Sequence, residues 1–304
     1  MHKIVSIILL SFFVAIAGNA VAQSVEQRSV APMSAFSPLE PASYILLGEG
    51  YGNIEPLVYE VGFAPQFRIA ANRFPNFGFI FTPNFVLRMR DQFSHPIRTP
   101  SYMPKGTLFY HVENDEVTGV DRFAFLTIGH HSNGQEGSFF EADSLTINTF
   151  NGSFSSNYAS LGYEWISPNK RTFNPTSNFR LSSTFYFVNK IIRSMYGPLR
   201  FQADLQSTLY LTGEKNNFFR PEKTRAALVG KMNVTWLAMG VKNAEPIDLK
   251  RLVFSYTLSY QPSFISDVAF FTRFYYGQDY YNINFERTLK VLQFGFSVRN
   301  ISFR

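Results

Sequence analysis

The sequence predicts an all-β chain that forms a transmembrane antiparallel β-barrel of about twelve strands. Three observations predict this fold: an excess of aromatic residues, an alternation of polar and apolar residues, and an amino-terminal export signal. Of the 304 residues, 17% are aromatic, with 34 Phe and 16 Tyr, although the mean hydropathy is only -0.07. Membrane barrels combine these properties, because aromatic girdles face the lipid interfaces while the interior stays polar.

The first 22 residues have the order of a secretory signal peptide. Lys3 provides a positive end, an apolar run follows from Ile4 to Ala17, and Ala20-Val21-Ala22 is a small-residue cleavage site. The apolar run is too short to cross a bilayer, since a spanning helix needs about 20 apolar residues. We therefore expect a removable signal at residues 1–22, a periplasmic arm at 23–43 and the barrel at 44–304.

Polar and apolar residues alternate most clearly between Leu199 and Leu211, where Arg200, Gln202 and Asp204 share one face and Leu, Phe and Ala residues share the other. This segment has the length of a tilted strand that crosses a bilayer. Because single-chain bacterial barrels have even strand numbers, twelve strands are favoured. The other strands are predicted at 252–260 and near 61–71, 77–89, 105–113, 121–132, 154–165, 179–190, 224–240, 265–276 and 289–303, with a short one at 44–48.

The connections differ in length, and this difference orients the barrel. Segments 90–104 and 133–153 are long, whereas 114–120 is short. Long loops of such barrels face the exterior and short turns face the periplasm. Strand 121–132 is therefore expected to run outward and to end near the outer leaflet.

Charge and cysteine content restrict the partners and the sources of stability. The chain has no cysteine, so disulfides do not contribute to its stability. Its net charge is +6, but the Lys and Arg residues are scattered and form no basic stripe with interleaved aromatics. This distribution argues against nucleic acid as a partner and favours anionic lipid head groups.

A candidate catalytic pair stands at the outer end of strand 121–132. Alternation places His130 and Ser132 on the same face as Leu126 and Ile128, which is the face expected to contact lipid. Polar residues in that position are costly, and they are functional candidates for that reason. His130 is placed to accept the hydroxyl proton of Ser132 and so make it a nucleophile. A His-x-Ser pair by itself is usually an ordinary surface pair.

A third group is needed to hold the imidazole in one tautomer. Asn157 is expected on the apolar face of the next strand, near the same rim. A neutral Asn suits a site exposed to hydrocarbon, because an unpaired carboxylate is costly to desolvate there. Asn148 and Asn151 lie earlier in the loop, and Asn151-Gly152 is better interpreted as a turn. His131 is the other candidate base, but alternation turns it toward the lumen, where a hydrogen-bonded structural role is expected.

The chain resembles the outer-membrane phospholipase A family in three ordered motifs. The segment His130-His131-Ser132-Asn133-Gly134 matches the family's His-x-Ser-Asn-Gly, and residues 94–104 are similar to its outer loop of the form S-x-P-F-R-x-T-N-Y-x-P. Ser155-Ser156-Asn157 is similar to the family's Ser-Trp-Asn, and Tyr276 to Asn282 also looks related. The resemblance extends from Phe67 to Phe296.

This resemblance implies calcium-dependent hydrolysis of phospholipid acyl esters, at either acyl position, by a homodimer in the outer membrane of Gram-negative type. His130 is the implied base, Ser132 the nucleophile and Asn157 the residue that orients the base. The backbone N–H of Gly134 is the implied oxyanion donor. Calcium ligands are implied at Ser94, the Gln135 carbonyl and the Ser138 hydroxyl. The loop departs from the family here, because it is longer and Gln135 and Gly137 replace an Arg and an Asp, so Glu136, Glu141 and Asp143 are alternative ligands.

Two other interpretations remain open from the sequence. The polar inward face, with Arg200, Asp204 and Glu164, also fits a non-enzymatic outer-membrane pore or structural barrel. The aromatic, strand-rich composition also fits a soluble periplasmic β-sandwich.

Overall fold

The computed structural model describes most of the predicted barrel. The described residues are 39–70, 74, 76–115, 117–167, 173–216, 223–265, 267–281, 283–298 and 302–303. The predicted signal peptide at 1–22 and most of the predicted arm, residues 23–38, lie outside the described residues. None of the helices in the described residues has the length and apolar character that a membrane-spanning helix requires.

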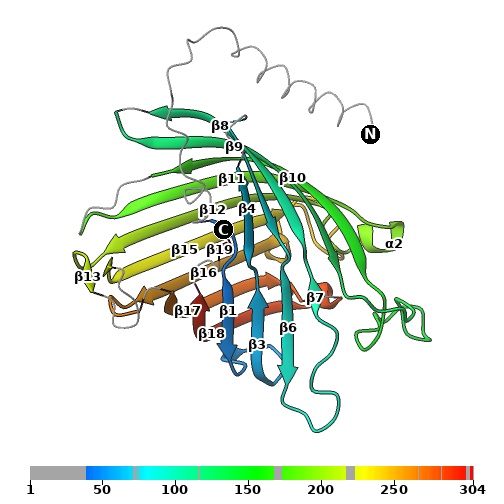
Figure 1. The fold of residues 1–304 in the computed structure, drawn as a ribbon. Helices are drawn as coiled ribbons and strands as arrows, with labels where there is room; N and C mark the ends of the chain where they lie inside the picture. Colours follow the sequence, from blue (N-terminus) through cyan, green and yellow to red (C-terminus); the bar gives the residue numbers. More distant parts are fainter. Residues whose placement is uncertain are drawn as a thin grey trace, which may run out of the picture. The chain divides into compact units, whose positions relative to one another are not determined.

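Within the described residues, the fold is a closed antiparallel barrel of twelve wall strands (Figure 1). The barrel closes at β1, which pairs with β3 on one side and with β18 on the other. The predicted strands are confirmed, including the short first one. The wall strands are β1 (Ser43–Leu47), β3 (Leu57–Phe63) with β4 (Gln66–Ala70), β5 (Phe77–Thr82) with β6 (Phe85–Arg90), β7 (Ser101–Tyr102) with β8 (Lys105–Asp115), β9 (Val120–Ser132), β10 (Ser155–Ile166), β11 (Thr176–Phe187), β12 (Leu199–Tyr210), β15 (Ala227–Leu237), β16 (Leu252–Gln261), β17 (Val268–Gln278) and β18 (Thr288–Val298).

Three adjacent wall strands are interrupted at nearly the same level. The breaks lie between β3 and β4, between β5 and β6 and between β7 and β8, and each contains a proline: Pro65, Pro83 and Pro104. Proline has no N–H to donate to a strand ladder, so it interrupts the pairing. The strands predicted as continuous near 61–71 and 77–89 are therefore each divided into two. At the end of this row of breaks, the Pro104 carbonyl accepts a hydrogen bond of 3.0 Å from the backbone N–H of His130.

The polarity of the wall is inverted relative to a water-soluble protein. On β9, Ile128 is 65% exposed, whereas the neighbouring Thr127 is buried and its hydroxyl bonds that of Thr107 at 2.9 Å. Membrane barrels show this alternation of apolar outside and polar inside, so the soluble β-sandwich interpretation is wrong. The exposed apolar side chains of the wall include Ile45, Leu47, Val58, Phe63, Phe67, Phe77, Phe81, Leu108, Leu126, Leu181, Phe201, Tyr256, Leu258, Tyr260, Phe270 and Phe294.

Buried ion pairs fill part of the barrel interior. The Arg88 side chain on β6 is fully buried; its Nε donates to Glu60 on β3 at 2.7 Å, and both terminal nitrogens donate to Asp279 at 3.1 Å. Arg273 on β17 and the Tyr280 hydroxyl also bond Glu60, at 3.3 and 2.8 Å. Charges out of contact with water are tolerated only when paired and hydrogen-bonded in this way. The cluster therefore links strands that are distant in the sequence.

The first described residues enter the same interior. Glu40, which the sequence analysis assigned to a periplasmic arm, is buried and pairs with Lys105 at 2.6 Å and with Arg180 at 3.0 Å. Arg180 also pairs with the buried Glu164 on β10 at 2.6 Å. The described end of the predicted arm, up to β1, therefore belongs to the barrel.

The lengths of several connections agree with the prediction. The segments after β6 and β9 are long, and the turn after β8 is short, as expected. However, the segment between β12 and β15 is also long, although it lies at the end of the barrel that was expected to carry short turns. This segment contains a small ladder of two strands, β13 and β14. The remaining elements are β2 (Tyr51–Gly52), β13 (Lys215–Asn216), β14 (Lys223–Thr224), β19 (Ser302–Phe303), the helix α2 (Lys190–Arg193) and the 3-10 helices η2 (Leu249–Arg251) and η3 (Asn284–Glu286).

Replacing Glu60 by Gln is expected to destabilise the barrel, because Arg88 and Arg273 would then lose a buried counter-charge. Removing one partner of a buried pair costs about 3–5 kcal/mol. Guanidinium unfolding of the refolded protein in detergent, followed by tryptophan fluorescence, measures this loss.

The matched control is Glu286→Gln, which breaks an exposed pair with Lys242 (2.9 Å, side chains 34% and 51% exposed). Exposed pairs contribute at most about 1 kcal/mol. Equal losses in the two variants would contradict a special role for the interior cluster.

Candidate active site

Two neighbouring strands position the candidate catalytic residues. β9 and β10 pair in antiparallel register, with His130 opposite Asn157 and Ser132 opposite Ser155. Because Leu126 and Ile128 are exposed on the outer wall, alternation directs His130 and Ser132 to the same outer face. Directly opposite residues on one face bring their side chains together. The pairing therefore explains why residues 27 positions apart meet.

His130 and Asn157 form a hydrogen bond of 2.8 Å between Nδ1 and Oδ1. The amide oxygen of Asn only accepts, so the imidazole Nδ1 carries the proton and donates it. In this tautomer, Nε2 is left with a lone pair and is able to accept a proton. The arrangement is the one that a general base requires when a third residue holds its ring.

Ser132 lies two residues beyond His130, half-buried, at the last position of β9. Among the described residues, none forms a hydrogen bond with its hydroxyl. Bonds between a nucleophile and its base are often long without substrate and tighten in the complex. Ser132 therefore lies beside the base on the same face without yet being bonded to it.

A sharp turn follows Ser132 and is held by Asn133. The side-chain Oδ1 of the buried Asn133 accepts from the Phe154 N–H at 2.9 Å, and its Nδ2 donates to the Gly152 carbonyl at 2.7 Å. Gly134 has φ +63°, a left-handed conformation that glycine adopts at no steric cost. No described residue accepts a hydrogen bond from the Gly134 N–H, so this donor is available to a ligand.

The His131 side chain points into the barrel interior, as predicted. Its Nε2 bonds the Ser101 hydroxyl at 2.7 Å, its Nδ1 bonds the Tyr196 hydroxyl at 3.1 Å, and its ring lies edge-on to Phe154 with centroids 5.0 Å apart. Ser101 and His131 are both buried. This second Ser–His pair is therefore enclosed in the interior and serves as a structural contact.

The candidate calcium ligands are oxygen donors on two loops. Ser94 and Ser138 are exposed, Gln135 is partly buried, and among described residues none bonds the Ser94 hydroxyl, the Ser138 hydroxyl or the Gln135 carbonyl oxygen. The described residues contain no cluster of three or more His, Cys, Asp or Glu that suits a metal. Of the alternative acids, Asp143 accepts bonds from the Thr146 hydroxyl, from the Thr146 N–H and from the Leu145 N–H, and these bonds lower its pKa. The three candidate ligands are oxygen atoms, which calcium prefers, but none of these oxygen atoms carries a charge.

The loop between β6 and β7, which carries the second resemblance motif, packs against the loop that follows Ser132. Arg98 donates to the Thr149 carbonyl at 3.4 Å and lies over the Phe150 ring at 5.3 Å. The His95 ring meets the same Phe150 edge-on at 6.3 Å. The side-chain roles of Asn133 and Arg98 were not predicted from the sequence, although the Asn-Gly pair at 133–134 is a turn signal that points to the first of them.

Within the described residues, the protein is a closed antiparallel barrel of twelve strands with an apolar wall, which fits an outer-membrane β-barrel. Neither the family models nor the curated protein sequences contain a match to this chain.

Solved structures show the same fold. Outer membrane phospholipase A from Escherichia coli is 13% identical with a TM-score of 0.57, over 86% of this chain and 98% of that one. The calcium-bound outer membrane phospholipase dimer from Salmonella typhi is 14% identical with a TM-score of 0.57, over 87% and 94%. An active-site asparagine-to-alanine mutant of the Escherichia coli protein is 12% identical with a TM-score of 0.55, over 94% and 97%. At this identity the likeness shows a shared fold.

Replacing Asn133 by Ala is expected to loosen the turn, because the Gly152 carbonyl and the Phe154 N–H would lose a buried partner. Leaving buried groups unpaired costs about 1–3 kcal/mol. Chemical unfolding measures the loss of stability, and amide hydrogen exchange at Phe154 should become faster.

Asn174→Ala is the matched control, since it removes the same side chain at an exposed position before β11. Its stability should stay within about 0.5 kcal/mol of the wild type. If Asn133→Ala were as stable as this control, the turn would not depend on Asn133.

Proposed function

We propose that the chain is an outer-membrane phospholipase that hydrolyses acyl ester bonds of phospholipids, with Ser132 as nucleophile, His130 as base and Asn157 as the residue that orients it. The observation that carries this proposal is the hydrogen bond of 2.8 Å between His130 and Asn157 on the outer wall. The likeness in fold to outer membrane phospholipase structures supports the same reaction class.

The chemistry begins at the Ser132 hydroxyl. Its oxygen attacks the acyl carbonyl while His130 Nε2 takes the hydroxyl proton, and the Nδ1–H bond to Asn157 keeps the ring in place. When the intermediate collapses, His130 returns the proton to the departing lysophospholipid oxygen. A water molecule, deprotonated by the same nitrogen, then cleaves the acyl-serine and releases the fatty acid.

The negative oxygen of the tetrahedral intermediate needs a donor that is already in place. The Gly134 N–H is the candidate, because its turn is fixed by Asn133 and by the left-handed backbone at +63°. One such donor lowers an activation barrier by about 2.7–4 kcal/mol. Calcium, when bound nearby through Ser94, Gln135 and Ser138, would supply further positive charge for this oxygen.

The outward direction of these side chains matches a lipid substrate. Ile128 and Leu126 surround the pair with apolar surface, so an acyl chain lies along the wall while its ester reaches the polar groups. A neutral Asn orients the imidazole without placing an unpaired carboxylate in hydrocarbon. The substrate thus approaches sideways from the membrane.

The alternative of a passive pore is disfavoured by the interior. A pore needs a water-filled lumen, whereas Arg88, Glu60, Glu164 and Gln293 are all within 1% of complete burial. These side chains occupy the space that permeating solutes would need.

Export and assembly are part of the same proposal. The predicted signal at residues 1–22 would direct the chain through the inner membrane. The active form is proposed to be a homodimer, in line with the calcium-bound dimer among the structures of the same fold.

Ser132→Ala is expected to lower fatty-acid release by at least about 10³-fold, because losing a nucleophile removes the covalent route. A lipid-hydrolysis assay with the refolded protein in detergent measures the rate.

The matched control is Ser101→Ala, which removes the serine that bonds His131 in the interior. It should keep most of its activity if the outer pair performs the reaction. Loss of activity in Ser101→Ala together with full activity in Ser132→Ala would transfer the chemistry to the inner pair and contradict the proposal.

Removing calcium with a chelator is expected to reduce hydrolysis. Because the three candidate donors carry no charge, half-maximal activity should need about 10⁻⁴–10⁻³ M calcium, the range of weakly charged sites. Ser138→Ala should raise this concentration, whereas Ser167→Ala, at the other end of β10, should leave it unchanged. Full activity in chelator would exclude a calcium requirement and leave the Ser–His–Asn proposal intact.

A further inference from the structure

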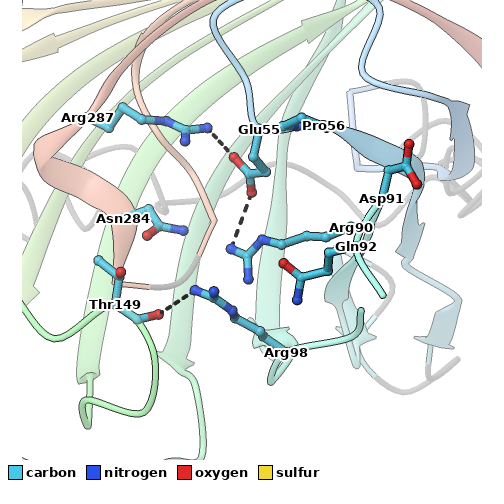
Figure 2. A pocket seen from close by; sticks show the side chains of 9 residues that line it. All are labelled: Glu55, Pro56, Arg90, Asp91, Gln92, Arg98, Thr149, Asn284 and Arg287. Carbon is cyan, nitrogen blue, oxygen red and sulfur yellow. Dashed lines mark hydrogen bonds and ion pairs between the residues drawn. The ribbon is translucent and has the colours of Figure 1, made fainter. Parts of the chain in front are cut away.

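A cavity of about 300 Å³ lies among the loops at the same end of the barrel as Ser132 (Figure 2). The segments after β2, β6, β9 and β17 contribute to it, and none of its residues belongs to the proposed catalytic set. Its charged and polar lining includes Glu55, Arg90, Arg98, Thr149, Asn284 and Arg287.

The positive charge of the cavity is only partly compensated. Glu55 accepts from Arg90 at 3.5 Å and also from Arg287, but it is shared with Arg88 of the interior cluster at 3.3 Å. Asp91 also lines the cavity, yet Figure 2 shows its carboxylate pointing away from the guanidinium groups. Arg287 also pairs with Asp279 of the interior cluster at 3.3 Å, whereas within the described residues Glu55 is the only carboxylate that pairs with Arg90.

Arg98 has no carboxylate within ion-pair distance among the described residues. Its polar contact is the neutral Thr149 carbonyl at 3.4 Å. Burial and the neighbouring Arg90 guanidinium both lower the pKa of Arg98, as expected for two like charges held close together. Arg98 is thus a cation that an added anion would stabilise.

Arg90, Arg98 and Arg287 each have a buried donor without a partner. Arg90 Nη1, Arg98 Nε and Arg287 Nε are shielded from solvent, and within the described part of the chain no acceptor reaches them. Buried charged donors are costly when unpaired, so an anion that accepted from them would be stabilised in the cavity. The Asn284 side chain adds a further amide to the lining.

We propose that this cavity binds a phosphate group, either free phosphate or the phosphomonoester of a lipid head group. Guanidinium groups present paired N–H donors that match phosphate oxygens, and several such forks around one cavity suit a multiply charged oxyanion. The cavity is also large enough to leave room for an ester substituent beside the phosphate.

A phosphate held there would connect the loops that surround it. Arg98 and Thr149 lie on different loops, and a recess lined by Arg90, Arg98, Asn133 and Gln135 leads toward the turn that follows Ser132. The anion would therefore stabilise the loop that carries Gly134, from outside the reaction site.

Isothermal titration of inorganic phosphate into the refolded full-length protein in detergent tests the proposal. Saturable binding is expected for the wild type, with affinity at least tenfold lower in Arg98→Gln and Arg287→Gln. Arg193→Gln is the matched control, because Arg193 is an exposed arginine of α2 and does not line the cavity. Its affinity should equal that of the wild type.

Reconstitution separates the two sources of phosphate. In phosphatidylcholine vesicles that also contain phosphatidic acid, a lipid ligand would compete with inorganic phosphate in the wild type. Unchanged phosphate affinity would assign the cavity to a soluble anion. Absence of saturable binding in the wild type, or equal affinities in Arg98→Gln and Arg193→Gln while both migrate as folded barrels, would overturn the proposal.

Discussion

Closure of the strand ladder between β1 and β18 is the constraint on which the rest of the structure depends. Hydrocarbon offers no partner for backbone N–H and C=O groups, so an open sheet edge in a membrane is too costly to persist. A first strand of only five residues closes the ring, because it pairs on both sides with β3 and β18. Closure fixes which face of every strand contacts lipid. It thereby determines at which positions a polar side chain has a high desolvation cost.

Polar groups on both faces of the wall offset this desolvation cost in the same way, by pairing across neighbouring strands. Inside, Arg88 is bound by Glu60 and Asp279, so a guanidinium is held without solvent. Outside, His130 is bound by Asn157, a partner without charge. The inner partners are charged and the outer partner is neutral because their surroundings differ. Ion pairs are tolerated where several partners converge, whereas on a wall facing lipid only neutral partners have a moderate desolvation cost.

The period-2 pattern predicted most of the fold and the direction of the candidate residues, because each side chain of a strand is directed by the residue's parity. The pattern predicted that the side chains of Leu126, Ile128, His130 and Ser132 face outward and that His131 faces inward. This prediction required no knowledge of distant contacts. Asn157 was predicted on the correct face, but its register opposite His130 depends on how the intervening loop folds. Other features depend on contacts between distant segments, which no local pattern contains. These are the burial of Glu40 in the interior, the pairing of Arg88 with Asp279 and the hydrogen bonds by which the Asn133 side chain holds its turn. The breaks at Pro65, Pro83 and Pro104 were visible as prolines, yet their alignment across three strands appears only when the register is known.

The row of proline breaks connects the wall to the candidate site. Proline has no backbone N–H, so the partner strand loses one ladder hydrogen bond at such a break, whereas the proline carbonyl can still accept one. The Pro104 carbonyl accepts from the N–H of His130 in register with the Lys105–Gly129 pair, so the ladder between β8 and β9 extends to His130 although Pro104 has no N–H to return. Beyond that point the loops are held by side chains, with Asn133 on one side and Arg98 against Thr149 on the other. The ladder between β9 and β10 therefore fixes the candidate residues, whereas the loops beyond it depend on a few side-chain bonds, and an anion in the proposed phosphate cavity would act on these loops.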